Sequence, residues 1–174
     1  MKSILFCLLA LLSLNANAQV DSEQWQTPAF KQHVLERLET LALATLQQNG
    51  ACSEQALQHA LSDTTVAQIS DLKLSGTEAQ VALVYLAYKA QGRCMGTLPL
   101  ETLSYLRIAQ TRFGEQSALY TSIGQSMLSD REHEAEYEYL YSQLPQAKRQ
   151  RLEGLAELGV PFNVSALQKL GATP

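Results

Sequence analysis

The sequence Thr-Glu-Ala-Gln-Val-Ala-Leu-Val-Tyr-Leu-Ala-Tyr-Lys-Ala-Gln, residues 77–91, is followed at once by Gly92. Thr77 and Gln80 have the spacing of a capping box, in which each side chain binds a backbone N–H group at the start of a helix. Gly92 stands where a glycine in the left-handed conformation commonly ends one. Residues 81–88 leave no polar face, and a helix that is apolar all round is covered by other elements. Because a membrane span needs roughly 20 apolar residues, the stretch predicts a central helix of a soluble fold.

The rest of the chain repeats the helical period of about 3.6 residues, without the alternation of a strand or an Asn-Gly or Asp-Gly hairpin. We therefore expect an all-α fold of about seven helices joined by short loops. Besides residues 77–91, the helices expected from caps and apolar spacing lie at 28–48, 53–61, 66–74, 99–113, 115–128, 129–144 and 147–158, with a last helical turn after Ser165.

The first eighteen residues have the features of a secretory signal peptide. Lys2 supplies the positive charge, residues 4–14 the apolar segment, and Ala16-Asn17-Ala18 a cleavage site of small residues. We therefore expect residues 1–18 to be removed and residues 19–174 to form a single domain. The expected location is the periplasm or the exterior, with no membrane insertion once the signal is gone.

The charge of the chain excludes some partners. Without Lys2, 12 basic side chains stand against 17 acidic ones, a net charge of 12 − 17 = −5. A mildly acidic domain without a basic patch argues against binding of nucleic acid or of anionic membrane surfaces. A protein is the expected partner.

Two cysteines, Cys52 and Cys94, remain after removal of the signal. In an oxidising compartment an isolated pair most often forms a disulfide, and both residues stand at predicted helix ends, where a bridge between neighbouring helices is easily made. The alternative is a redox-active pair, but no Cys-x-x-Cys motif and no βα pattern surrounds either residue. We expect a structural bridge worth on the order of 4 kcal/mol in the chain-entropy model.

Part of the chain resembles the tetratricopeptide and Sel1-like families of helical-hairpin repeats. The pattern is carried by residues 82–88 with Gly92, then by Tyr105-Leu106 with Ala109 and Gly114, and Tyr105-Leu106 recurs as Tyr139-Leu140. A second unit would take its first helix from residues 118–127 and its second from residues 135–145. The resemblance implies stacked hairpins that present a concave surface to a protein partner. An irregular helical bundle is the other arrangement that we consider.

The richest polar cluster is the run from Asp130 to Glu138. His133 with Glu136 has a spacing that suits metal binding, but the order is His-x-x-Glu and no second motif completes a site. The simpler interpretation is an acidic first turn that complements the helix dipole. No Gly-x-Ser-x-Gly motif and no phosphate-binding glycine loop is present, so we expect no catalytic site, no metal and no cofactor.

Tyrosines in and after this cluster suggest a partner-binding surface. Tyr137 and Tyr141 share one helical face among glutamates, whereas Tyr139 is expected beside the core. The pair is either exposed for a protein partner or packed against the neighbouring hairpin. The candidate partner-binding residues are Glu132, Glu134, Tyr137, Glu138 and Tyr141.

Three functions follow from these patterns as hypotheses. The first is a secreted or periplasmic helical protein that mediates protein–protein interaction and performs no chemistry. The second is a periplasmic immunity or inhibitor protein, whose acidic residues 132–138 would enter the basic active site of a toxic cell-wall enzyme. The third is an enzyme that uses His133 and nearby carboxylates.

Overall fold

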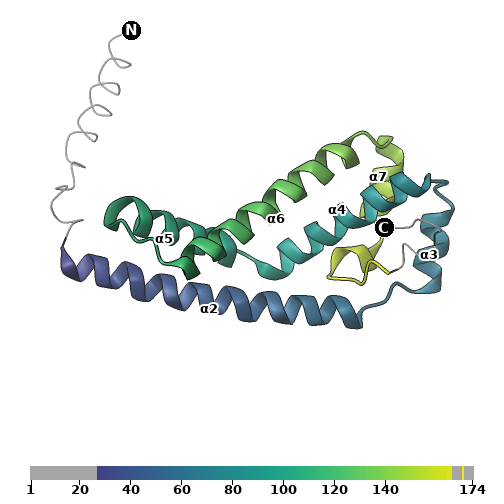
Figure 1. Cartoon of the computed structure of the whole chain (residues 1–174). Helices are drawn as coiled ribbons and strands as arrows, with labels where there is room; N and C mark the ends of the chain where they lie inside the picture. The colour runs from purple at the N-terminus through teal and green to yellow at the C-terminus, as the bar shows by residue number, and fades with distance from the viewer. Residues whose placement is uncertain (1–26, 166–169, 171–174) are drawn as a thin grey trace, which may run out of the picture.

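The computed structural model describes residues 27–165 and residue 170 (Figure 1). Within that part of the chain six α-helices and one 3-10 helix form, and no strand, which confirms the all-α prediction. The elements are α2 (Pro28–Gln58), α3 (Asp63–Ser70), α4 (Gly76–Met95), α5 (Leu98–Phe113), α6 (Ala118–Ser142), α7 (Gln146–Glu153) and η2 (Ala156–Gly159). The predicted signal peptide, residues 1–18, and the helical turn predicted after Ser165 lie outside the described residues.

Three rows of helix run side by side along an elongated molecule (Figure 1). α2 forms one row, and α4 followed by α5 forms the second, antiparallel to it. Gln91 Nε2 of α4 donates to Asn49 Oδ1 of α2 at 2.9 Å, and further on the rings of Phe113 and Phe30 meet edge to face with centroids 5.8 Å apart. α6 returns along α5 and α4 as the third row, while α3, α7 and η2 gather at one end.

Successive helices α4 and α5 make almost no contact with each other, because each packs on α2 and on α6 instead. In stacked hairpins each helix would pack against the next one along the chain. Of the two arrangements considered, stacked hairpins and an irregular bundle, the contacts of α4 and α5 therefore fit the irregular bundle. The chain turns from α4 to α5 at Gly96, whose φ of 61° lies in the region that only glycine adopts at little cost. Membership of the repeat family stays a prediction.

Two predicted helix breaks are wrong. α2 continues through Asn49-Gly50, and the helix expected at 53–61 is the end of α2, which stops at Gln58. A glycine inside a helix costs only about 1 kcal/mol, and the bonds that join this part of α2 to α4 outweigh that cost. Likewise α6 is one uninterrupted helix, so Ser129 is not an N-cap, because nothing between Gly124 and Ser142 forces the backbone out of the helical conformation. Fusion of these segments brings the helix count below the expected seven.

The central helix is longer than predicted at both ends. Its capping box is formed by Ser75 and Glu78, not by Thr77 and Gln80, and its C-cap is Gly96, not Gly92. Glu78 N donates to Ser75 Oγ at 3.2 Å, and Ser75 N donates to Glu78 Oε2 at 2.8 Å. The prediction that several elements cover this helix is confirmed, since α2, α6 and η2 all pack against α4.

This capping box makes the stability of the protein depend on pH. The hydrogen bond from the Ser75 backbone, with the charge of Lys148 nearby, lowers the pKa of Glu78 below its ordinary value of 4.5. A lowered folded-state pKa adds stability above the unfolded pKa, and that stability is lost as the pH falls through the folded pKa. In Glu78→Gln the amide keeps the cap geometry without the charge, so the free energy of unfolding should fall short of the parent's at about pH 6, and the difference should close as the pH falls through the folded-state pKa of Glu78. Urea unfolding of both proteins across this pH range measures the difference in the free energy of unfolding. A difference that does not change with pH would contradict the lowered pKa of Glu78 as its cause.

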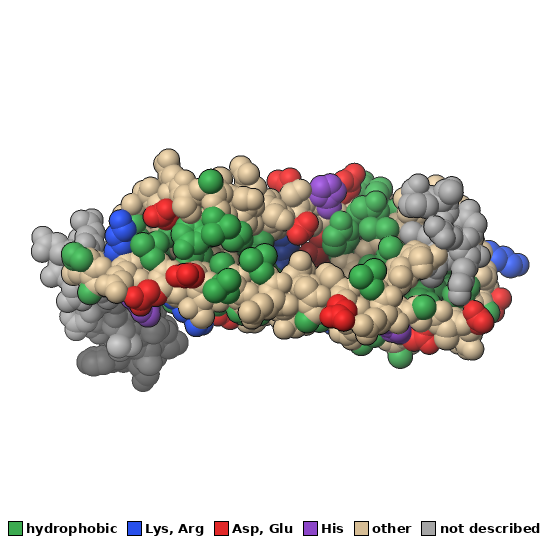
Figure 2. Space-filling model, turned by 60° about the horizontal axis from the view of Figure 1, so that its bottom comes forward, with side chains coloured by type: hydrophobic (Ala, Val, Ile, Leu, Met, Phe, Trp, Pro, Cys, Tyr) green, Lys and Arg blue, Asp and Glu red, His purple; other side chains and the backbone are tan. Residues whose placement is uncertain are grey.

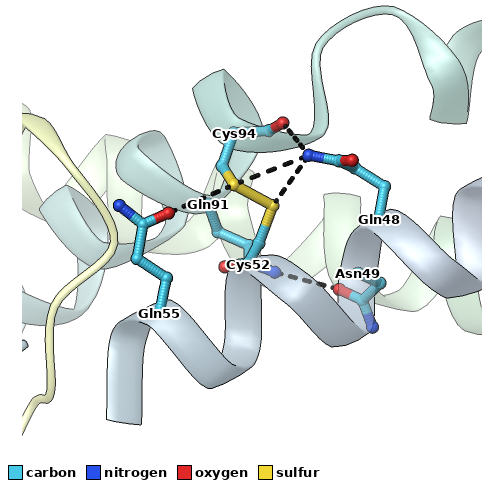
Figure 3. Close-up of a disulfide and its surroundings, with 6 residues drawn as sticks. All are labelled: Gln48, Asn49, Cys52, Gln55, Gln91 and Cys94. Atoms are coloured by element: carbon cyan, nitrogen blue, oxygen red, sulfur yellow. Dashed lines mark hydrogen bonds between the residues drawn. A yellow bond between two sulfur atoms is a disulfide. The ribbon is translucent and has the colours of Figure 1, made fainter. Parts of the chain in front are cut away.

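The predicted disulfide between Cys52 and Cys94 is confirmed, and it joins α2 to α4 with the two Cα atoms 6.0 Å apart (Figure 3). Beside it Gln48 Nε2 donates to the Cys94 carbonyl oxygen at 2.9 Å. The bond between Gln91 and Asn49 lies next to these groups, as Figure 3 shows. α2 and the end of α4 are therefore held together by the disulfide and by hydrogen bonds from Gln48 and Gln91.

Most buried apolar side chains in the described part of the chain belong to one of two clusters. The larger lies where α3, α4, α7, η2 and the end of α6 meet, and it includes Ile69, Leu83, Tyr141, Leu152 and Phe162. The smaller joins α2 to α5 through Val34, Leu38, Leu106 and Ala109. The middle of the molecule lies between these two clusters.

Candidate functional site

A cleft of about 450 Å³ opens in the middle of the molecule. This central cleft is bounded by the middle of α2, the end of α4, the start of α5 and the first two thirds of α6. Because the row of α4 and α5 turns at Gly96, its side chains do not fill the space between α2 and α6 there. Figure 2 shows a face that is hollowed near its middle, with hydrophobic side chains on either side.

The walls of the central cleft are mostly apolar. The apolar side chains that line it are Leu46, Met95, Pro99, Leu103, Ile123 and Met127. Leu46, on α2, is 55% exposed, whereas Met95 at the end of α4 is buried. An apolar cleft of this size with a few polar groups is the kind of site in which proteins bind ligands or the side chains of partners.

A hydrogen-bonded pair of threonines fixes one wall. Thr45 Oγ1 of α2 and Thr102 Oγ1 of α5 lie 2.8 Å apart, and both residues are buried. Thr102 Oγ1 also donates to the carbonyl oxygen of Leu98 at 2.8 Å, so Thr45 donates to Thr102. Together with the disulfide, this pair holds α2 in place on both sides of the cleft.

One end of the central cleft is charged. Asp130, Arg131 and Glu134 of α6 line it next to Tyr88 of α4. Arg131 Nη1 donates to Glu134 Oε2 at 3.0 Å. Partial burial, with the negative charges of Asp130 and Glu134 nearby, raises the pKa of the Tyr88 phenol above its ordinary value of 10.0. The Tyr88 ring lies 6.1 Å from that of Tyr137.

The structure separates the five candidate partner-binding residues. Glu134 lies at the cleft and Tyr137 is half-buried against Tyr88, while Glu132 and Glu138 are exposed. Tyr141 is only 3% exposed. Of the two alternatives for the tyrosine pair, packing against a neighbouring helix is correct, and the exposed pair is wrong.

Helix geometry explains which tyrosine is buried. With about 100° per residue, positions 130, 134, 137 and 141 share one face of α6, and position 139 points the opposite way. Tyr141 stacks on Tyr85 with centroids 4.5 Å apart, and burial raises the pKa of its phenol. Tyr139, expected beside the core, is 66% exposed instead. The direction was mispredicted because the helix packs through its Tyr137 and Tyr141 face.

The metal-ligand pattern considered around His133 was compared with the described residues. They contain no group of three or more His, Cys, Asp or Glu side chains placed to hold a metal ion. His133 is exposed on α6, where its Nδ1 lies 2.8 Å from the Ser129 carbonyl oxygen of the preceding turn. The described helices also lack any segment with the length and hydropathy of a membrane span.

Sequence reasoning did not identify the central cleft. Leu46, Ile123 and Met127 stand at the apolar spacing of a helix, a pattern that by itself predicts a core face and not a cleft. The signal available in the sequence is the Gly96 to Pro99 interruption, which marks where one row of helix stops and another begins. It does not show which helices lie across from that interruption.

Comparison of the chain with protein-family models, with curated proteins and with solved structures found no match.

Proposed function

We propose that this protein binds another protein through the central cleft and performs no chemistry of its own. The main support is the cleft itself, in which apolar side chains remain accessible between two well-packed clusters. The disulfide and the threonine pair fix its walls before a partner arrives, and a preorganised site loses less entropy on binding. The disulfide also supports the periplasm or the exterior as the location, because such bonds persist in oxidising compartments.

A second candidate is the periplasmic inhibitor of a toxic cell-wall enzyme. The observation in its favour is the outer face of α6, where Glu132 and Glu136 are exposed together with Tyr139. Acidic groups on a protruding surface complement a basic active site and speed association with it.

Photocrosslinking separates the two candidates. The crosslinker p-benzoylphenylalanine is placed at Leu46 on the cleft, at Tyr139 on the outer face of α6, and at Leu57, which is 72% exposed and away from both, as the matched control. Adducts formed in extract of the producing cells' envelope identify the partner, which is then purified for measurement of Kd.

Binding through the cleft predicts an adduct from position 46 and a loss of affinity of about tenfold or more in Leu46→Asp, since an apolar contact is replaced by a charge. Crosslinking from position 139, with affinity lost in Glu132→Gln plus Glu136→Gln, would favour the inhibitor. A partner whose Kd is unchanged by Leu46→Asp contradicts the cleft as the binding site.

A further inference from the structure

At the charged end of the central cleft, acidic side chains outnumber basic ones. Residues 130–138 of α6 carry five acidic side chains and one arginine. Asp130 and Glu134 line the cleft, whereas Glu132 and Glu136 lie on the far side of the helix. Arg131 pairs with Glu134, and no basic side chain among the described residues forms an ion pair with Asp130. One carboxylate at the cleft is thus left without a counter-charge.

An aromatic ring stands beside these carboxylates. Tyr88 lines the same end of the cleft, and the electron-rich faces of tyrosines attract ammonium and guanidinium groups. Asp130 and Glu134 line the cleft together with this ring, and their charges add to burial in raising the pKa of the Tyr88 phenol. A ring flanked by carboxylates favours a cation over an anion.

The rest of the cleft is apolar, so a ligand with a cationic group beside Tyr88 should also carry an apolar group next to it. Leu46, Leu103 and Met127 line it on three different helices. Leu46 is 55% exposed, so the apolar lining of the cleft reaches the surface of the molecule at α2. A polypeptide segment that carries an apolar side chain next to a basic one suits both the apolar lining and the negatively charged end of the cleft. Amphipathic helices bind hydrophobic grooves in this way, through apolar side chains spaced along one face.

We propose that the occupant of the central cleft is a basic amphipathic segment of the protein partner, with an apolar side chain between Leu46, Leu103 and Met127 and a Lys or Arg beside Tyr88 and Asp130. This inference rests on the proposed function and specifies the chemistry of the partner. The net charge of the chain, −4, agrees with it, because an acidic protein attracts basic segments at long range.

The test uses two synthetic helical peptides that are identical except for charge, one with leucines on one face and lysines on the other, and one with glutamates in place of the lysines. Fluorescence anisotropy measures the Kd of each for the oxidised protein. The lysine peptide should bind at least about tenfold more tightly than the glutamate peptide. Asp130→Asn plus Glu134→Gln should remove that preference, and Leu46→Ser should weaken the lysine peptide without removing its preference.

Glu132→Gln plus Glu136→Gln is the matched control, because it changes the net charge of α6 equally but away from the cleft. This variant should keep the lysine peptide's Kd within about twofold, since exposed charges beyond a Debye length of about 8 Å are screened. An equal effect of the two double variants would overturn the inference, because the attraction would then come from overall charge.

Failure of this inference differs from failure of the proposed function. If the purified partner binds through Leu46 but loses no affinity in Asp130→Asn plus Glu134→Gln, the basic segment is refuted and binding through the cleft stands. If neither peptide binds and no adduct forms from position 46, both are refuted.

Discussion

Removal of the disulfide by Cys52→Ala with Cys94→Ala should lower the free energy of unfolding by about 4 kcal/mol. The two cysteines are 42 positions apart, and breaking a crosslink that closes a loop of this length restores that much chain entropy to the unfolded state. The bond joins α2 to α4 between the two apolar clusters.

Denaturant unfolding of the oxidised protein, the reduced protein and the double variant measures this loss. The reduced protein and the variant should agree within about 1 kcal/mol, since both lack the same crosslink. A loss smaller than about 1 kcal/mol in the variant would contradict a crosslink that acts on the unfolded chain.

Truncation of Leu83 by Leu83→Ala should cost about 3 kcal/mol, within the range of about 2–5 kcal/mol for deleting a buried leucine side chain. Leu83 is 0% exposed in the middle of α4 and belongs to the larger apolar cluster. The loss combines the apolar surface no longer buried with a cavity that the surrounding helices cannot close fully.

The matched control is Leu57→Ala, the same substitution at a leucine that is 72% exposed near the end of α2. It should change the free energy of unfolding by no more than about 0.5 kcal/mol. Equal losses at positions 57 and 83 would show that helix propensity, and not packing around α4, determines the effect.

Local signals in the sequence correctly predicted the ends of α5, the disulfide and the burial of the central helix. Pro99 and Gly114 mark the start and end of α5 correctly, because proline at the first turn and glycine in the left-handed conformation act within a few residues. The pairing of Cys52 with Cys94 followed from their being the last two cysteines. The apolar run of residues 81–88 indicated correctly that several elements cover α4.

Two other local signals do not mark helix ends in the structure. Asn49-Gly50 resembles a helix end, but links to residues 91 and 94 hold this part of α2 to α4. Ser129 resembles an N-cap, yet it lies inside α6. A capping signal decides the end of a helix only where no tertiary contact favours its continuation.

The sequence by itself determined the all-α class, the disulfide and the coverage of the central helix, because apolar periodicity, cysteine number and helix caps act locally or by composition. Only the tertiary structure decided which face of α6 packs, burying Tyr141 and exposing Tyr139. It also decided that Leu46, Met127 and Asp130 meet around one cleft. The physical reason is that a helical stripe shows which residues share a face, whereas the register between helices depends on all the side chains that pack between them.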